Sequence, residues 1–252
     1  QLHLRISNAL KLIAIVTHYL KQYETMNKKF NSVYEYYNDD NIIDNILNPD
    51  FFGKNLWHTP LLLTHESNIV NENEFMIINS NVKNNDTILD FGCGVGGFLR
   101  IIMDKYKCKA YGVNISPKQI ELAEKNFNKK ENVEFIFSWG MSYLENNSID
   151  VIFAQESIVH CKDKEKLFNG LYRILKPNGV LIFLDWFLYN KELAIKTDIE
   201  YKTFIESLDT YKELLNKTGF KNINIYDPIN TDELDRVRNE KGFTNYIIKC
   251  KK

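Results

Sequence analysis

A glycine-rich stretch at residues 87–100 carries the strongest chemical signal in the sequence. It reads Thr-Ile-Leu-Asp-Phe-Gly-Cys-Gly-Val-Gly-Gly-Phe-Leu-Arg. Residues 88–89 are typical of a short buried strand, and a helix is predicted to begin at about Gly97. The glycines between them let the backbone approach a ligand closely, and the first N–H groups of the helix can bind its polar atoms. The stretch therefore predicts a nucleotide-binding corner.

Two ligands fit such a corner. The spacing of residues 92–97 matches the G-x-G-x-x-G pattern of nicotinamide and flavin dinucleotide sites. Alternatively, the loop holds the amino-acid part of S-adenosylmethionine. Asp90 favours this second interpretation, because a carboxylate would repel a pyrophosphate but accepts a hydrogen bond from an ammonium group. A tight turn without a ligand is the third interpretation, and four glycines in six positions argue against it.

A carboxylate and an imidazole follow a second apolar run, in the sequence Phe-Ala-Gln-Glu-Ser-Ile-Val-His-Cys at residues 153–161. Glu156 comes directly after a predicted strand, where a carboxylate is costly unless it is paired or used. His160 is four residues further on, so the two share one face if the segment is a helical turn. We expect Glu156 to act as a general base or to stabilise a cation, and His160 to be a second base or to orient Glu156. The structural alternatives are a carboxylate bonded to backbone N–H groups and an ordinary turn histidine.

Alternating strands and helices must position these residues. The predicted strands are residues 88–89, 109–113, 133–137, 150–154, 180–185, 223–226 and 246–249. The predicted helices cover residues 71–82, a segment from about 97, 117–127 with Ser116 as N-cap, segments between 155 and 175, and 190–217 with Gly219 as the stop. Residues 176–179, Lys-Pro-Asn-Gly, are predicted to form a turn. This alternation predicts an α/β fold with a mostly parallel seven-stranded sheet and helices on both faces.

The N-terminal part differs from the rest in its pattern. Residues 7–23 are predicted to form an amphipathic helix, residues 28–48 are helical in pieces, and the aromatic-rich segment 49–68 is a candidate lid. We therefore expect residues 1–70 to be a helical extension and lid, and residues 71–252 to be the core of one globular domain.

Two side chains after the second and third predicted strands suggest how an adenosine would be bound. Asn114 stands where this topology reaches the ribose hydroxyls, and an asparagine both donates and accepts hydrogen bonds there, more weakly than a carboxylate. Trp139 follows the third strand, where it either covers the adenine or belongs to the core.

The segment 87–185 resembles the class I S-adenosylmethionine-dependent methyltransferases. Residues 87–97 resemble their first motif, residues 112–119 (Gly-Val-Asn-Ile-Ser-Pro-Lys-Gln) resemble the segment after strand two, and residues 175–182 (Leu-Lys-Pro-Asn-Gly-Val-Leu-Ile) resemble the turn before strand five. The resemblance implies a Rossmann-like fold, S-adenosylmethionine as the cofactor and no metal. It implies cofactor contacts from Asp90, Gly92, Cys93, Gly94, Asn114, Ile115, Gln119, Trp139, Gly140, Met141 and Gln155. Two departures are Asn114 in place of the commoner acidic residue and the missing acidic residue after strand three.

Residues 156–160, Glu-Ser-Ile-Val-His, resemble a segment of small-molecule methyltransferases, including those that methylate carbon in isoprenoid diphosphates and sterols. In that chemistry an alkene attacks the methyl group, a carboxylate removes a proton, and aromatic faces stabilise the cation. The resemblance implies an isoprenoid-like substrate and Glu156 as base, with His160 beside it. The expected substrate-binding residues are Tyr37, Trp57, His58 and Trp186. The alternatives are O- or N-methylation of a small hydroxyl or amine compound with His160 as base, and a catalytically idle cofactor-binding module that regulates a partner.

Composition narrows the class of protein. The 252 residues carry a net charge of −1, so no basic field indicates nucleic acid, and we expect a small-molecule substrate. The four cysteines contain no C-x-x-C pair and indicate free thiols in a reducing, cytoplasmic setting. The apolar run at residues 9–16 is too short to span a bilayer, so we expect no transmembrane segment. The pattern leaves open whether the protein forms a homo-oligomer.

Overall fold

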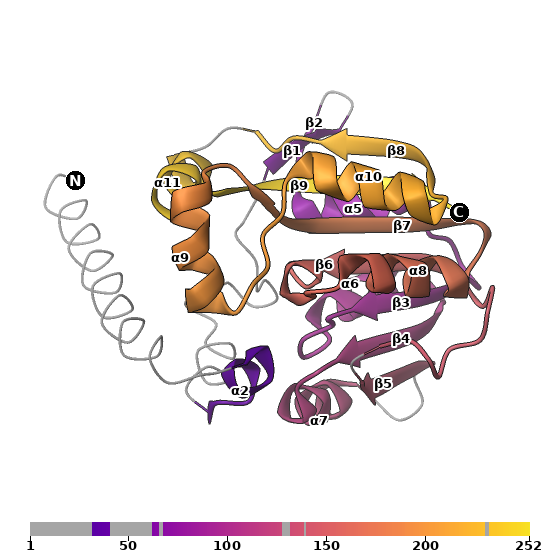
Figure 1. Cartoon of the computed structure of the whole chain (residues 1–252). Helices are drawn as coiled ribbons and strands as arrows, with labels where there is room; N and C mark the ends of the chain where they lie inside the picture. The colour runs from indigo at the N-terminus through magenta and orange to yellow at the C-terminus, as the bar shows by residue number, and fades with distance from the viewer. Residues whose placement is uncertain (1–31, 41–61, 66–67, 128–131, 139, 230–231) are drawn as a thin grey trace, which may run out of the picture.

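The computed structural model describes residues 32–40, 62–65, 68–127, 132–138, 140–229 and 232–252, and its centre is a seven-stranded sheet (Figure 1). The strands are β3 (Thr87–Phe91), β4 (Lys109–Asn114), β5 (Val133–Phe137), β6 (Ile149–Gln155), β7 (Leu175–Leu188), β8 (Lys221–Tyr226) and β9 (Phe243–Lys251). Their order is β5-β4-β3-β6-β7-β9-β8. The first five in this order are parallel, whereas β9 pairs antiparallel with both β7 and β8. The prediction of a mostly parallel seven-stranded sheet is confirmed.

Helices cover both faces of this sheet (Figure 1). On one face lie α5 (Glu72–Ser80), α6 (Gly97–Lys105) and α7 (Pro117–Asn126), whose apolar residues form one core cluster with the sheet. On the other face lie α8 (Lys164–Ile174) and α10 (Leu208–Thr218), within a second cluster. Burying both faces accounts for the nearly continuous apolar sequence of the central strands.

A third group of elements lies beyond the carboxyl ends of the parallel strands (Figure 1). It contains α2 (Val33–Tyr37), α9 (Lys191–Tyr201), α11 (Asp232–Lys241) and the short 3-10 helix η1 (Ile158–His160). A separate antiparallel hairpin joins β1 (Leu62–His65) to β2 (Asn68–Asn71). Ligands of open α/β sheets bind at this end of the strands, so these elements frame the candidate site.

The local sequence accounts for several boundaries. The predicted cap of α7 is confirmed, because the Ser116 side chain accepts a hydrogen bond from the Gln119 N–H and Pro117 fills the first helical position. Gly219 ends α10 with a φ of 111°, as predicted.

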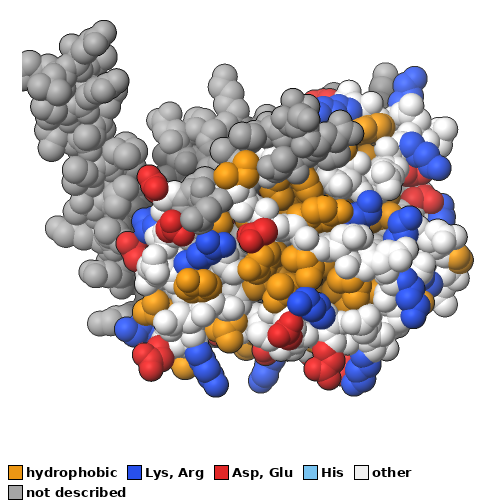
Figure 2. All heavy atoms as spheres, turned by 90° about the horizontal axis from the view of Figure 1, so that it is seen from above, with side chains coloured by type: hydrophobic (Ala, Val, Ile, Leu, Met, Phe, Trp, Pro, Cys, Tyr) orange, Lys and Arg blue, Asp and Glu red, His pale blue; other side chains and the backbone are white. Residues whose placement is uncertain are grey.

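Seen from above, both signs of charge intermix around the apolar side chains, in keeping with the small net charge (Figure 2).

Four expectations differ from the structure. The helix predicted over 190–217 is two helices, because Lys202 ends α9 in the left-handed conformation and Ser207 caps the start of α10. Residues 176–179 lie within β7 rather than in a free turn, beside a register shift in β6. The hairpin β1–β2 overlaps the candidate lid, and α11 was not predicted, since its charged sequence has no apolar period. The predicted helix over 7–23 and the rest of the lid, residues 49–61, lie outside the described residues.

No helix among the described residues is long and apolar enough to cross a membrane.

Tyr211 of α10 gives a test of the core. Its side chain is fully buried against Phe168, Phe183 and Phe187, yet among the described residues its hydroxyl has no hydrogen-bond partner. Because an unpaired buried hydroxyl is costly, we expect Tyr211→Phe to leave the free energy of unfolding unchanged or raise it by about 1 kcal/mol. Tyr211→Leu removes the ring contacts and should cost about 2 kcal/mol or more. Urea denaturation measures both, and a clear loss in Tyr211→Phe would contradict the expectation.

Candidate active site

The glycine loop between β3 and α6 is held against β4. The N–H groups of Gly92 and Cys93 donate to the Val113 carbonyl at 2.8 and 3.0 Å. Gly92 and Gly94 adopt φ values of 82° and 55°, which disfavour other residues. Asp90, at the end of β3, is only 3% exposed. The corner therefore has the strand–loop–helix geometry that the sequence predicted.

Two of its glycines face different surroundings. A Cβ atom on Gly92 would lie 2.3 Å from the Ser157 Cβ, whereas a Cβ on Gly94 would meet nothing within 4 Å. The Ser157 hydroxyl also donates to the Phe91 carbonyl at 2.7 Å. Gly92 therefore lets the segment that follows β6 pack directly on the loop, and Gly94 borders open space.

Asn114 ties the loop to the start of α7. Its Nδ2 donates to Gln119 Oε1 at 2.7 Å and to the Gly94 carbonyl at 3.3 Å. Its Oδ1 accepts from the N–H groups of Ile115 and Ser116. Both amide hydrogens and the carbonyl oxygen thus have partners in the protein. Binding of a ribose by the Asn114 side chain stays a prediction and would require an exchange of these bonds.

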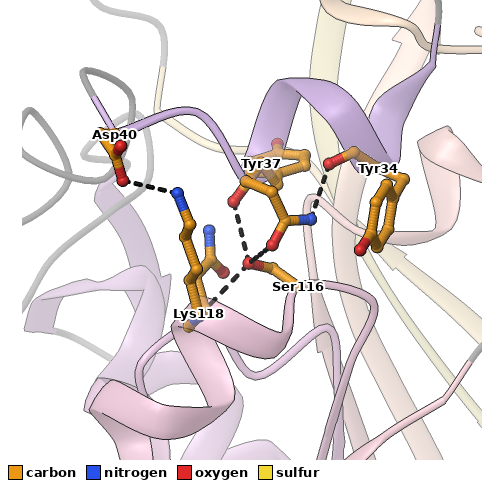
Figure 3. Close-up of polar contacts among 7 residues, drawn as sticks. Tyr34, Tyr37, Asp40, Ser116 and Lys118 are labelled. Carbon is orange, nitrogen blue, oxygen red and sulfur yellow. Dashed lines mark hydrogen bonds and ion pairs between the residues drawn. The ribbon is translucent and has the colours of Figure 1, made fainter.

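The helix α2 docks on this same corner (Figure 3). The Ser116 hydroxyl donates to the Tyr37 carbonyl and to Asn38 Oδ1, each at 2.9 Å. Lys118 forms an ion pair with Asp40 at 2.5 Å. Ser116 therefore caps α7 and holds α2 with one hydroxyl group.

The docked helix places Tyr37 against His160, 123 residues away in the sequence. The Tyr37 hydroxyl and His160 Nε2 are 3.1 Å apart, and their rings meet edge to face. His160 Nδ1 lies 3.2 Å from the Lys202 carbonyl. Because a carbonyl only accepts, Nδ1 carries the proton and Nε2 accepts from the tyrosine. Burial lowers the pKa of His160 to about 4, and the imidazole is therefore neutral at pH 7.

Glu156 stands at the end of β6 in a strained conformation. Its φ is 48°, unusual for a residue other than glycine, and its N–H still bonds to the Leu184 carbonyl of β7. Its Oε1 accepts from Asn245 Nδ2 at 3.3 Å. Glu156 and His160 were expected on one helical turn. Instead, the left-handed residue at 156 is followed by η1, and the charge of Glu156 raises the pKa of His160 against the larger effect of burial.

A fully buried carboxylate, that of Asp185, is hydrogen-bonded to η1. Asp185 Oδ2 accepts from the Val159 N–H and Oδ1 from the Trp186 N–H, both at 2.8 Å. Burial raises the pKa of Asp185 to about 7. Lys164, 4% exposed, lies near this carboxylate, whose charge raises the lysine pKa against the larger lowering effect of burial. Asp185 thus fixes the residue next to His160.

The loop between α9 and α10 closes around this turn. The Phe204 N–H donates to the Val159 carbonyl at 2.8 Å. Lys164 Nζ donates to the Phe204 carbonyl at 2.5 Å and to the Cys161 carbonyl at 3.0 Å. Together with the His160–Lys202 contact, these bonds join the loop to η1 at several points.

The remaining predicted residues have varied places. Cys93 and Met141 are buried in the two apolar clusters. Gln155 donates to Asn73 Oδ1 of α5 at 2.8 Å, and a Cβ on Gly140 would meet open space. Trp186 stacks on Phe243 at 4.2 Å. The predicted Trp57, His58 and Trp139 lie outside the described residues.

Sequence reasoning missed Asp185, Lys164 and Asn245. A signal existed for Asp185, because it follows five apolar residues of a strand, and Glu156 likewise follows a mostly apolar strand. Nothing local in the sequence distinguishes Lys164 from the surface lysines around it, or Asn245 from the other asparagines.

Comparison with known proteins places this geometry in a family. Residues 89–183 match the family model described as a methyltransferase domain. These residues form a methyltransferase domain. It runs from β3 to β7 and contains the glycine loop, Glu156, His160 and all of the candidate cofactor residues.

Curated relatives of the methyltransferase domain include enzymes of two named activities. Phosphoethanolamine N-methyltransferase 2 of Caenorhabditis elegans is 30% identical over 151 residues, which cover 56% of this chain and 34% of that protein. Sterol 24-C-methyltransferase of Kluyveromyces lactis is 26% identical over 182 residues, covering 66% of this chain and 49% of that protein. The chain thus spans between a third and a half of the length of these relatives.

Solved structures share the fold. Phosphoethanolamine N-methyltransferase 2 of Haemonchus contortus, in complex with S-adenosyl-L-methionine, has a TM-score of 0.73 at 18% identity and covers 89% of this chain and 61% of its own. Geranyl diphosphate C-methyltransferase of Streptomyces coelicolor A3(2) has a TM-score of 0.64 at 16% identity, with 71% of this chain and 78% of its own covered. The expectation of a Rossmann-like methyltransferase fold is confirmed.

His160 gives a pH-dependent test. Its pKa falls from 6.5 to about 4 on folding, so the unfolded chain binds more protons between these values. Stability should therefore rise with pH across this window, and His160→Gln should abolish that contribution, worth up to about 3 kcal/mol. Asp185 has a raised pKa and makes stability fall with rising pH. Because Asp185 is present in both the wild-type protein and His160→Gln, its contribution cancels when their stabilities are subtracted. Urea denaturation from about pH 4 to pH 7 measures the effect. Parallel pH profiles of the two proteins would contradict it.

Proposed function

We propose that this chain is an S-adenosylmethionine-dependent methyltransferase that acts on a small molecule. The observation that carries the proposal is the direct contact between the glycine loop after β3 and the turn that follows β6. Ser157, between Glu156 and His160, packs on Gly92 and bonds to the Phe91 carbonyl. A cofactor seated in the open space at Gly94 would therefore have ionisable groups beside its reactive end. The methyltransferase-domain match supports this chemistry over a dinucleotide site.

The sulfonium of the bound cofactor would supply the methyl group together with a good leaving group, so the protein mainly aligns the acceptor and excludes water. We propose that Asp90 and the backbone of residues 92–94 hold the methionine end. Asn114, Ile115 and Gln119 would lie on the ribose side, with residues 139–141 around the base and Gln155 as a further cofactor residue. Because Asn114 and Gln155 already have protein partners, they would shape the pocket wall.

Two substitutions in the glycine loop test fold stability and cofactor binding separately. Gly92→Ala should destabilise the fold, because its Cβ would clash with Ser157 in addition to about 1–2 kcal/mol of backbone strain. Gly94→Ala carries only the strain, but its methyl group would enter the space proposed for the cofactor. We expect Gly94→Ala to weaken S-adenosylmethionine binding by calorimetry more than Gly92→Ala does, and Gly92→Ala to lose more stability in urea. The reverse ranking would place the cofactor elsewhere.

For the methyl acceptor, the first candidate is the carbon of an isoprenoid-like molecule, with Glu156 as base. The names of the sterol and geranyl diphosphate relatives support it. The carboxylate stands at the end of β6 beside His160, and Trp186 lies nearby on β7. One face of that indole is already covered by Phe243, which limits its contact with a cation.

The second candidate is N- or O-methylation of a small amine or hydroxyl compound, and the Tyr37–His160 pair favours it. A neutral imidazole that accepts from a tyrosine can take up a proton through it when the acceptor loses one. The names of the phosphoethanolamine relatives support an amine. We further propose that residues 1–70 cap this site, that the acceptor is no nucleic acid, and that the free cysteines reflect a reducing, cytoplasmic setting.

Paired substitutions test these roles. Purified protein is given S-adenosylmethionine with geranyl diphosphate or with phosphoethanolamine, and S-adenosylhomocysteine is quantified. A general base contributes roughly 10²–10⁴-fold, so Glu156→Gln should lose about that factor in kcat with the carbon acceptor, and His160→Gln with the amine. Cofactor affinity, measured by calorimetry, is the control and should stay unchanged. Wild-type turnover by Glu156→Gln would refute its role as base. Tight cofactor binding without product from any acceptor would instead support a regulatory module.

A further inference from the structure

Asn245 of β9 lies fully buried beside the Glu156 carboxylate. It is 0% exposed, and its Nδ2 donates to Glu156 Oε1 at 3.3 Å. It faces Trp186 directly across the antiparallel β7–β9 ladder, so the two side chains lie on the same face of the sheet. Asn245 therefore brings an amide from the last strand to the proposed site of methyl transfer.

Two polar atoms of this pair are left unsatisfied. Asn245 Oδ1 and Trp186 Nε1 are both buried, and neither has a hydrogen-bond partner within the part of the chain that the structure describes. Buried polar groups in folded proteins are nearly always paired, so each unpaired group calls for an explanation. One atom is an acceptor and the other a donor, and they come from adjacent positions on one face. A bound molecule with its own donor and acceptor would satisfy both.

We propose that Asn245 orients the Glu156 carboxylate and that its Oδ1 accepts a hydrogen bond from an N–H or O–H group of the methyl acceptor. Trp186 Nε1 donates to an oxygen of the same molecule. This inference rests on the proposed function and specifies its substrate class as a small polar amine or hydroxyl compound. A hydrocarbon chain offers neither group and would leave both atoms unpaired.

The positioning role has a physical reason. Glu156 holds a left-handed backbone conformation, and its charge raises the pKa values of the buried Asp185 and of the partly buried His160 and Tyr37, so these groups lie near its carboxylate. A donor from Asn245 fixes one carboxylate oxygen within this cluster. Because Asn245 belongs to β9, its position is set by the sheet and not by a loop.

Kinetics of the full chain test the acceptor contact. Asn245→Leu removes both polar atoms at similar volume, and Thr244→Val is the matched control. Thr244 is also buried on β9 and accepts from Arg238 Nε at 3.0 Å, but its side chain points to the opposite face. With phosphoethanolamine as the amine probe, Asn245→Leu should lower kcat/KM by about tenfold or more, with cofactor affinity unchanged. Thr244→Val should stay near wild type. Equal effects of the two substitutions would overturn the proposal.

A second measurement needs no turnover. In protein labelled with 15N-asparagine, the Asn245 side-chain amide is assigned by its absence from Asn245→Leu. Its resonances should move in Glu156→Gln and stay in place in Thr244→Val. They should move again when phosphoethanolamine is added to protein saturated with S-adenosylhomocysteine, and not with geranyl diphosphate. An amide unmoved by Glu156→Gln overturns the positioning role, and one that responds only to geranyl diphosphate overturns the substrate class. Calorimetry with S-adenosylmethionine reports separately on the proposed function.

Discussion

The hydrogen bond from the Val159 N–H to the buried Asp185 carboxylate is the constraint on which the candidate site depends. It ties the turn after β6 to the neighbouring strand β7, two residues after Ser157 meets the glycine loop. His160 follows Val159 directly, so its position is set by this bond. The Val159 carbonyl also receives the Phe204 N–H, which brings the α9–α10 loop to the same turn. A single buried carboxylate thus organises elements that are distant in the sequence.

The parallel sheet explains why so many polar groups meet here. The carboxyl ends of parallel strands lie at the same edge of the sheet. Asp90, Glu156 and Asp185 lie near the carboxyl ends of β3, β6 and β7 and therefore meet at that edge. Three carboxylates so close to an apolar core would be unfavourable without compensation. Backbone N–H groups, Lys164 and Asn245 provide part of it, and the raised pKa of Asp185 is the sign that compensation is incomplete.

The sequence predicted the parts of this arrangement that depend on local pattern. Strand–glycine–helix spacing located the corner, and Ser116 before Pro117 located the start of α7. The same reasoning singled out Glu156, because a charged residue directly after an apolar strand stands out, and His160, because it is four residues further on. It did not predict how they meet, since the left-handed Glu156 and the tie through Asp185 are tertiary effects. Nothing in the sequence pointed to Asn245 for the same reason, because its contact with Glu156 forms only when β9 pairs with β7.

The double use of Ser116 has a consequence for timing. One hydroxyl group both caps α7 and holds the backbone of α2, whose Tyr37 reaches His160. Withdrawal of α2 would therefore break the tyrosine–histidine contact and the hydrogen bonds from Ser116 in one movement. A reaction that needs the tyrosine–histidine contact can therefore proceed only while α2 is docked on Ser116, so one hydroxyl group couples the start of α7 to the assembly of that pair.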